Sequence, residues 1–116
     1  MSITADLIRG HTDTIILAAL MLEDSYGYHI SRMISKQTDG RFEMKEATLY
    51  TAFKRLEEVG YISSYWGEEG TGARRRYYAI TTMGREAYAR LMREWEEAGA
   101  LIEKLIRVPA DNRQHT

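Results

Sequence analysis

Apolar residues recur at helical spacing along the first third of the chain. Between residues 4 and 23 they are dense and helix breakers are few, which predicts one largely buried helix with Gly10 as a weak point inside it. A second helix follows, with Asp24 and Ser25 as candidate N-terminal caps and an end near the turn-forming pair Asp39 and Gly40. The apolar positions of the two helices are Leu7, Ile8, Ile15, Ile16, Leu17, Leu20 and Met21, and then Tyr26, Ile30, Met33 and Ile34.

A third helix is predicted over residues 45–59. Its apolar positions lie at i, i+4 and i+7, on one face, and are Leu49, Phe53 and Leu56. Gly60 is well placed to end this helix in the left-handed conformation. Just before the helix, we expect a very short strand at residues 42–44.

Two segments after the third helix have the composition of strands. Residues 62–66 and 75–80 are rich in aromatic and β-branched residues, and they flank a glycine-rich loop. They predict a β-hairpin with a mobile tip over residues 67–72.

The last helix, predicted over residues 82–106, has a different kind of apolar stripe. Its members recur at alternating steps of three and four, the spacing of a coiled-coil seam, and are Tyr88, Leu91, Trp95, Ala98, Ile102 and Leu105. A helix of this length extends about 37 Å, farther than a small domain can cover. We therefore expect the stripe to pack against a second copy of the chain in a two-fold homodimer.

The composition of the chain indicates the cellular compartment in which we expect the protein. The chain has 116 residues and no cysteine, so disulfides and thiolate metal ligands are excluded, which suits a reducing cytoplasm. The first residues lack the regions of a signal peptide, and the longest apolar run, residues 15–22, is shorter than the roughly 20 residues that cross a bilayer. We expect a cytoplasmic protein that makes no membrane contact.

The formal net charge is −1, yet the stretch GEEGTGARRRYYAITTMG, residues 67–84, places three arginines together after a glycine-rich turn. Consecutive arginines are often only a solvated surface. Here they fall on a hairpin that follows a helix with an exposed polar face, and both elements can meet one DNA duplex. Because neighbouring strand residues point to opposite faces, at least one arginine is expected to face away from DNA.

The order of elements predicts a mostly α fold with a small β-hairpin (α+β), a winged helix-turn-helix with a long C-terminal dimerisation helix. We expect the DNA-binding part at residues 1–81, the dimerisation helix at 82–108 in the same cooperative unit, and a flexible tail at 109–116. The residues expected to contact double-stranded DNA are Lys45, Thr48, Tyr50, Thr51, Lys54, Arg74 and Arg75.

Two other classes of function compete with a DNA-binding regulator. The histidines, His11, His29 and His115, lack the spacing of metal ligands, and no nucleophile elbow or phosphate loop is present. We therefore expect no enzyme activity, no metal and no cofactor. The net negative charge keeps open a winged-helix module that binds proteins and not DNA.

Two stretches, EATLYTAFKRLEEVGYISSYW and GARRRYYAITTMG, resemble the PadR family of bacterial transcriptional regulators, in particular its short subgroup of multidrug-sensing repressors. The resemblance covers about residues 5–106. It implies a homodimeric repressor of a transporter or stress-response gene that binds a pseudo-palindromic operator. The matching positions are Leu49, Tyr50, Arg55, Leu56, Glu57, Gly60 and Ile62, and then Gly72, Arg74, Arg75, Tyr77, Tyr78, Ile80, Thr81 and Gly84.

The same resemblance implies a ligand site at the dimer interface, where paired tryptophans sandwich flat hydrophobic or cationic aromatic compounds. Trp95 stands at the matching position, and the other residues implied to line the site are Leu7, Thr14, Met92 and Gly99. One repressor of this subgroup has an aspartate at the position of Gly99, a phenylalanine at that of Met92 and an aliphatic residue at that of Thr14, so we expect a pore of different size and charge. Heptad spacing alone favours a simpler role for Trp95, as a packing residue of the seam.

Overall fold

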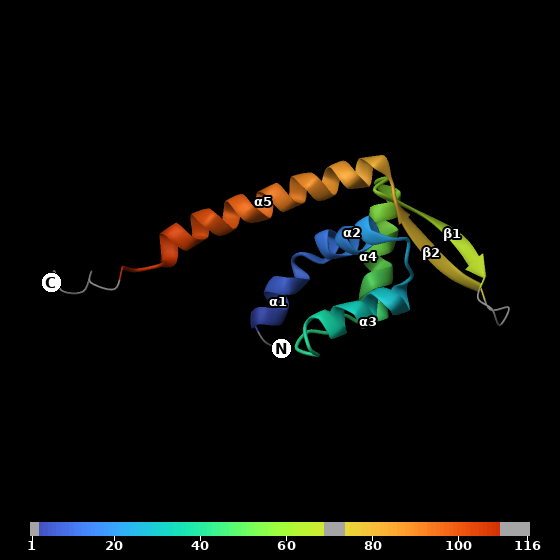
Figure 1. Ribbon diagram of the computed structural model, residues 1–116, viewed down its shortest axis with the longest axis horizontal. Coiled ribbons are helices and arrows are strands. Elements are labelled where there is room, and N and C mark those ends of the chain that lie inside the picture. Colours follow the sequence, from blue (N-terminus) through green and yellow to red (C-terminus); the bar gives the residue numbers. More distant parts are fainter. Residues whose placement is uncertain (1–2, 69–73, 110–116) are drawn as a thin grey trace.

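The computed structural model describes residues 3–68 and 74–109. Five helices and one hairpin follow each other in these ranges (Figure 1): α1 (Ile3–Arg9), α2 (Thr12–Leu22), α3 (Gly27–Gln37), α4 (Glu46–Glu58), β1 (Ile62–Glu68), β2 (Arg74–Ile80) and α5 (Thr82–Ile106). The mostly helical fold with one small antiparallel hairpin and a long last helix confirms the predicted fold class.

The first predicted helix is two helices. The α1 helix ends at Arg9, just before Gly10, and His11 N donates to Ile8 O at 2.9 Å in the turn that follows. The Thr12 hydroxyl then donates to Arg9 O at 2.7 Å, and α2 begins. The expectation of one continuous helix is wrong because glycine offers little resistance to leaving the helix and the Thr12 hydroxyl satisfies a carbonyl at the break.

Asp24 and Ser25 do not cap α3. The cap residue is Tyr26, which makes no side-chain capping bond. Instead, Ser25 exchanges two backbone hydrogen bonds with Tyr78 of β2, at 3.1 and 2.7 Å, and the Tyr65 hydroxyl donates to Asp24 Oδ2 at 2.6 Å. The segment before α3 is therefore bound to the hairpin, and these bonds replace the predicted caps.

Residues 42–44 are extended but form no strand, contrary to expectation. Phe42 and Met44 are buried in the core, and their carbonyl oxygens accept bonds from Thr38 Oγ1 and Ser31 Oγ, both at 3.0 Å. Side chains of α3 and of its C-cap residue, Thr38, thus satisfy this segment, so it needs no neighbouring strand.

The core lies between α2, α3, α4 and the root of the hairpin. Its largest fully buried side chains are Ile16, Leu17, Leu20, Ile30, Leu49, Phe53, Leu56 and Ile62. The hairpin is antiparallel, with Ile62 opposite Ile80 at its root and Glu68 opposite Arg74 at its far end. The predicted strands are confirmed, whereas most of the predicted mobile tip falls on residues 69–73, outside the described residues.

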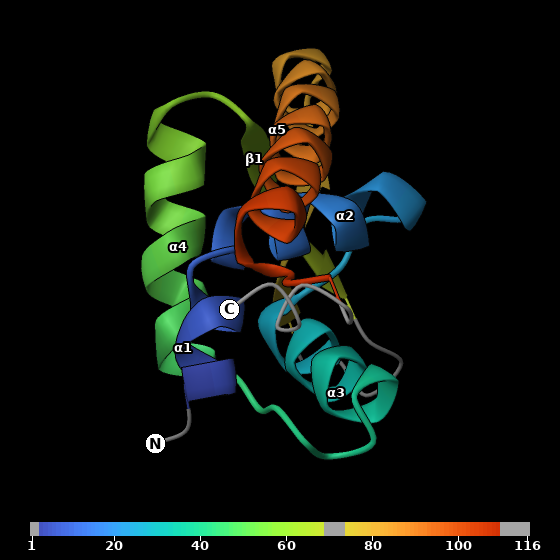
Figure 2. The same cartoon turned by 90° about the vertical axis from the view of Figure 1, so that its left-hand side faces the viewer.

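Helix α5 starts at a tightly bonded corner and then leaves the core. The Thr81 hydroxyl accepts from Gly84 N at 3.0 Å and donates to the carbonyl of Gly60, whose positive φ of 88° confirms the predicted helix end there. Figures 1 and 2 show α5 running past α2 and projecting beyond the rest of the molecule. Its first turns bury Gly84 and Ala87, whereas nearly all of its residues from Arg93 onward are exposed.

Gly84→Ala tests this corner. A Cβ at residue 84 would overlap the backbone carbonyl of Tyr61 and lie 2.8 Å from Ile80 Cγ1. We expect a loss of about 1–3 kcal/mol in the free energy of unfolding, measured by urea titration, because backbone cannot move aside as a side chain can. The matched control is Gly99→Ala in the same helix, where a Cβ meets nothing within 4 Å; it is expected to add up to about 1 kcal/mol. Equal effects of the two substitutions would contradict the close approach.

Candidate nucleic-acid interface and adjoining groove

Helix α4 has a buried face and an exposed polar face. Leu49, Phe53 and Leu56 are buried as predicted. Thr48, Thr51 and Lys54 are exposed, and Lys45 is exposed at the N-cap. The face available to a ligand therefore carries hydroxyls and ammonium groups, which bind phosphates and base edges.

Tyr50 lies where α3 and α4 meet. Its ring passes so close to Gly27 that a Cβ there would lie 3.0 Å from the ring, which explains a glycine at this position. The hydroxyl donates to Glu46 Oε1 at 3.2 Å. Partial burial, and secondarily this bond to Glu46, raise the pKa of Tyr50 above its ordinary value, so the ring is neutral at physiological pH. Tyr50 is half-exposed and can offer its edge to a bound duplex.

The three arginines divide between the two faces of the hairpin. Arg74 and Arg76 lie over the Trp66 ring, with guanidinium carbons 5.1 and 5.2 Å from its centroid. Arg75 lies on the opposite face, 4.6 Å from the centroid of the Tyr26 ring, and is half-buried. Strand alternation predicts a division, but the structure pairs Arg74 with Arg76 where the sequence led us to group Arg74 with Arg75.

Aromatic rings fix the face of the hairpin that carries Arg75. Tyr77 stacks on Tyr65 with centroids 5.6 Å apart and meets Tyr26 edge-on at 5.2 Å. Tyr26 precedes Gly27, and Gly27 lies against the Tyr50 ring of α4. The face of the hairpin that carries Arg75 is therefore joined to α4 through the start of α3.

Arg55 is exposed on α4, and it forms an ion pair with Asp13 of α2. Both residues line an open groove of about 490 Å³ between the α1–α2 segment and α5. This contact between the third predicted helix and α2 is not visible in local sequence spacing.

The groove contains most of the predicted ligand site. Four of its five predicted residues, Leu7, Thr14, Trp95 and Gly99, line it together with Leu91, Ala98 and Ile102 of the predicted seam. Met92 is not among the lining residues. Trp95 is 54% exposed, and its ring meets the His11 ring edge-on, with centroids 4.9 Å apart. His11 was not expected in this site.

The predicted seam divides along α5. Tyr88 and Leu91 pack against the core of their own chain. Ala98, Ile102 and Leu105 are exposed, and so are Leu101 and Ile106, which heptad counting did not select. The distal half of α5 therefore carries an apolar surface wider than an a/d stripe.

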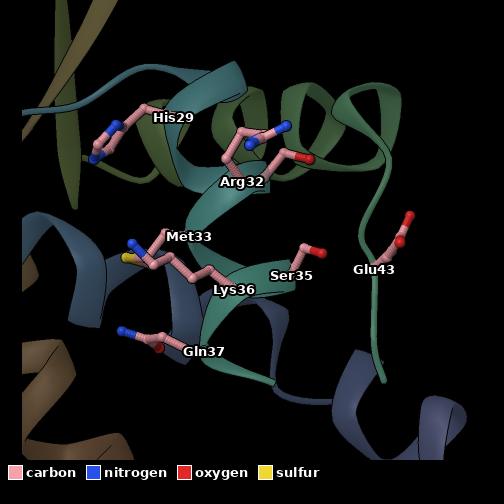
Figure 3. A pocket seen from close by; sticks show the side chains of 8 residues that line it. His29, Arg32, Met33, Ser35, Lys36, Gln37 and Glu43 are labelled. Carbon is pink, nitrogen blue, oxygen red and sulfur yellow. The ribbon is translucent and has the colours of Figure 1, made fainter. Parts of the chain in front are cut away.

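A second hollow, of about 970 Å³, follows the outer surface of α3 (Figure 3). His29, Met33, Lys36 and Gln37 extend to one side of the helix in this view, and Glu43 lies across from them on the following segment. None of the predicted site residues lines it. Its cationic residues, Arg32 and Lys36, share the polar side of α3, so helical spacing could have indicated them.

Within residues 3–68 and 74–109, no cluster of three or more histidine, aspartate or glutamate side chains is arranged to hold a metal ion. Over the same ranges, the helices lack the combination of length and apolarity that a membrane span requires.

The three-helix arrangement α2–α3–α4, with the hairpin beside α4, is that of a winged helix-turn-helix protein. Residues 16–90 match the family model described as the transcriptional regulator PadR-like family. The chain belongs to the PadR-like family of transcriptional regulators, which are DNA-binding regulators and not enzymes.

Individual relatives agree with this assignment. A solved transcriptional regulator from Clostridium thermocellum is 49% identical, with a TM-score of 0.81, and the match covers 91% of this chain and all of that one (100%). A PadR family transcription regulator from Clostridium difficile is 33% identical with a TM-score of 0.70, covering 84% and 99%. An uncharacterized protein of Lysinibacillus sphaericus is 44% identical over 101 residues, covering 87% and 93%.

We expect the loss of an arginine to lower the free energy of unfolding by different amounts on the two faces of the hairpin. Arg75→Ala removes a half-buried stem and a cation–π contact with Tyr26, so we expect the free energy of unfolding to fall by about 1 kcal/mol. Arg74→Ala, at an exposed position, is expected to cost less than about 0.5 kcal/mol. Thermal unfolding of the two variants at one protein concentration measures the difference, and the reverse order would contradict the assigned faces.

Proposed function

We propose that the chain is a homodimeric transcriptional repressor of a transporter or stress-response gene, and that a small hydrophobic or cationic aromatic compound lowers its affinity for DNA. The observation that carries the DNA-binding part is the contact of Arg75 with Tyr26 at the start of α3, next to Gly27 and the Tyr50 ring, which links a cation of the hairpin to α4. This concentration of positive charge in a chain of net charge −1 favours a polyanionic partner.

In this proposal α4 enters the major groove and the hairpin follows the backbone. Thr48 and Thr51 reach base edges, and Lys45 and Lys54 neutralise phosphates. Tyr50 contacts the backbone from the α3–α4 junction, and Arg74 and Arg75 contact phosphates from the two faces of the hairpin. Phosphate contacts supply affinity and registration, and the α4 contacts supply sequence selectivity.

The dimer in this proposal forms through the distal half of α5. The apolar residues there, Ala98, Leu101, Ile102, Leu105 and Ile106, are exposed within their own chain. A second copy related by a two-fold axis covers them and sets two α4 helices against half-sites about 34 Å apart. The operator is accordingly pseudo-palindromic.

The groove beside α5 is the proposed ligand site. It offers the Trp95 ring and the aliphatic side chains Leu7 and Ile102 for stacking and burial, and Glu94 to a cationic ligand. Met92 is the fifth residue that the resemblance implies, and it does not line the groove within one chain. In this proposal it borders the site. The ion pair between Asp13 of α2 and Arg55 of α4 links the groove to α4, because both partners line the groove and Arg55 is part of that helix.

A ligand can lower DNA affinity only by binding the two dimer geometries unequally. A cation in the groove competes with Arg55 for Asp13, and a flat ring against Trp95 sets the distance between the paired α5 helices. Both effects change where α4 stands in the dimer.

Lys54→Ala tests the role of α4. The variant should bind duplex DNA more weakly across sequences, and the slope of log K against log salt should fall by about 1 for the lost phosphate contact. Fluorescence anisotropy of a labelled duplex from upstream of the chain's own coding sequence measures both. Lys104→Ala, an exposed lysine at the far end of α5, is the matched control and should leave the slope unchanged. If the unaltered protein binds no duplex at low salt, the proposed DNA-binding function is wrong. The alternative, a winged-helix module that binds proteins, then takes its place.

Trp95→Ala tests the groove. A cationic rhodamine should quench the fluorescence of the unaltered protein and lower its affinity for the duplex, and both effects should disappear in the variant. Trp66→Phe, which removes the only other tryptophan, should leave the quenching intact. Sedimentation establishes that the Trp95 variant is still a dimer. Unchanged rhodamine binding by a dimeric Trp95→Ala protein would exclude the tryptophan as a ligand residue and leave it as a seam residue.

A further inference from the structure

We propose that Trp66 is a positioning residue of the hairpin, which holds the guanidinium groups of Arg74 and Arg76 as a preformed pair for DNA backbone phosphates. This inference rests on the proposed DNA-binding function and adds two residues to it, Trp66 and Arg76. All three arginines then contact DNA, which departs from the expectation that at least one of them faces away.

Strand register places the three side chains on one face. Trp66 of β1 stands directly opposite Arg76 of β2, and Arg74 precedes Arg76 by two residues, so strand alternation directs it to the same side. The guanidinium carbons lie 5.1 Å and 5.2 Å from the indole centroid, within the range of about 6 Å for cation–π attraction. One ring therefore contacts both cations.

Packing in the core does not explain why a large aromatic residue stands at position 66. It is 54% exposed, and Arg74 and Arg76 are exposed as well. A tryptophan that only stabilised the core would be covered, as Phe53 and Ile62 are. The surface that Trp66 offers is instead occupied by two cations.

The chemistry of guanidinium suits this arrangement. A guanidinium that stacks with its flat face on an aromatic ring keeps its N–H edge free for bidentate bonds to phosphate oxygens. A long side chain already held near its bound geometry loses less conformational freedom on binding. Two arginines on one ring are thereby prepared for the polyanion before it arrives, whereas Arg75 is held separately by Tyr26.

The proposal predicts that Trp66 acts through the arginines and not by its own contact with DNA. Two variants separate the ring from its bulk: Trp66→Phe keeps an aromatic face, and Trp66→Leu keeps an apolar side chain without one. We expect Trp66→Leu to weaken binding of a labelled duplex about threefold to tenfold at low salt, and Trp66→Phe to keep most of the affinity. The salt slope of Trp66→Leu should stay close to that of the unaltered protein, because both arginines still reach phosphate.

The decisive comparison repeats Trp66→Leu in an Arg74→Ala/Arg76→Ala background. That background should lower the salt slope by about 2, and Trp66→Leu should then have no further effect on affinity. An equal loss in both backgrounds would show that Trp66 contacts DNA itself and would overturn the positioning role. Full affinity of a Trp66→Leu protein with unchanged thermal unfolding would overturn it too. Both results differ from failure of the unaltered protein to bind any duplex, which would remove the proposed function along with this inference.

Discussion

The contact on which the arrangement of the molecule depends is the stack of Phe53 on Tyr78, with ring centroids 4.1 Å apart and planes 25° from parallel. Phe53 is the central buried residue of α4, and Tyr78 lies in β2. Two backbone bonds join Tyr78 to Ser25, at the entrance to α3. Tyr78 thus ties α4, the hairpin and the start of α3 together. The surfaces that carry Lys54 and Arg75 therefore cannot move independently.

Burial at this junction raises the pKa of Tyr78, although the neighbouring Arg76 acts in the opposite direction. Because the folded-state pKa lies above the unfolded value, the contribution to stability is complete below about pH 10 and is lost as pH rises through the folded pKa. The Tyr78 ring therefore stays neutral throughout the physiological range, and its stack with Phe53 does not depend on pH there.

The sequence was sufficient wherever local periodicity decides the structure. The α4 core face, the hairpin strands and the whole of α5 followed from spacing and composition alone. It was insufficient where a distant partner decides: Ser25 was assigned to a cap because β2 competes for it only in the folded chain, and the ion pair between Arg55 and Asp13 was not expected because the two residues lie far apart in sequence. The α1–α2 break was missed for a local reason, a hydroxyl bond from Thr12 that propensity does not weigh.

The groove shows that a sequence can indicate individual residues of a site without indicating which other residues they meet there. Heptad spacing and resemblance indicated Trp95, but neither could place His11 against its ring or Arg55 in the same groove. His11 belongs to the α1–α2 break and Arg55 to α4, so only tertiary packing brings them to a groove beside α5. If α4 faces DNA and α5 pairs two copies of the chain, as proposed above, a molecule in this groove contacts the two elements whose relative position sets the operator spacing. Regulation by a ligand would then act across the width of the groove alone.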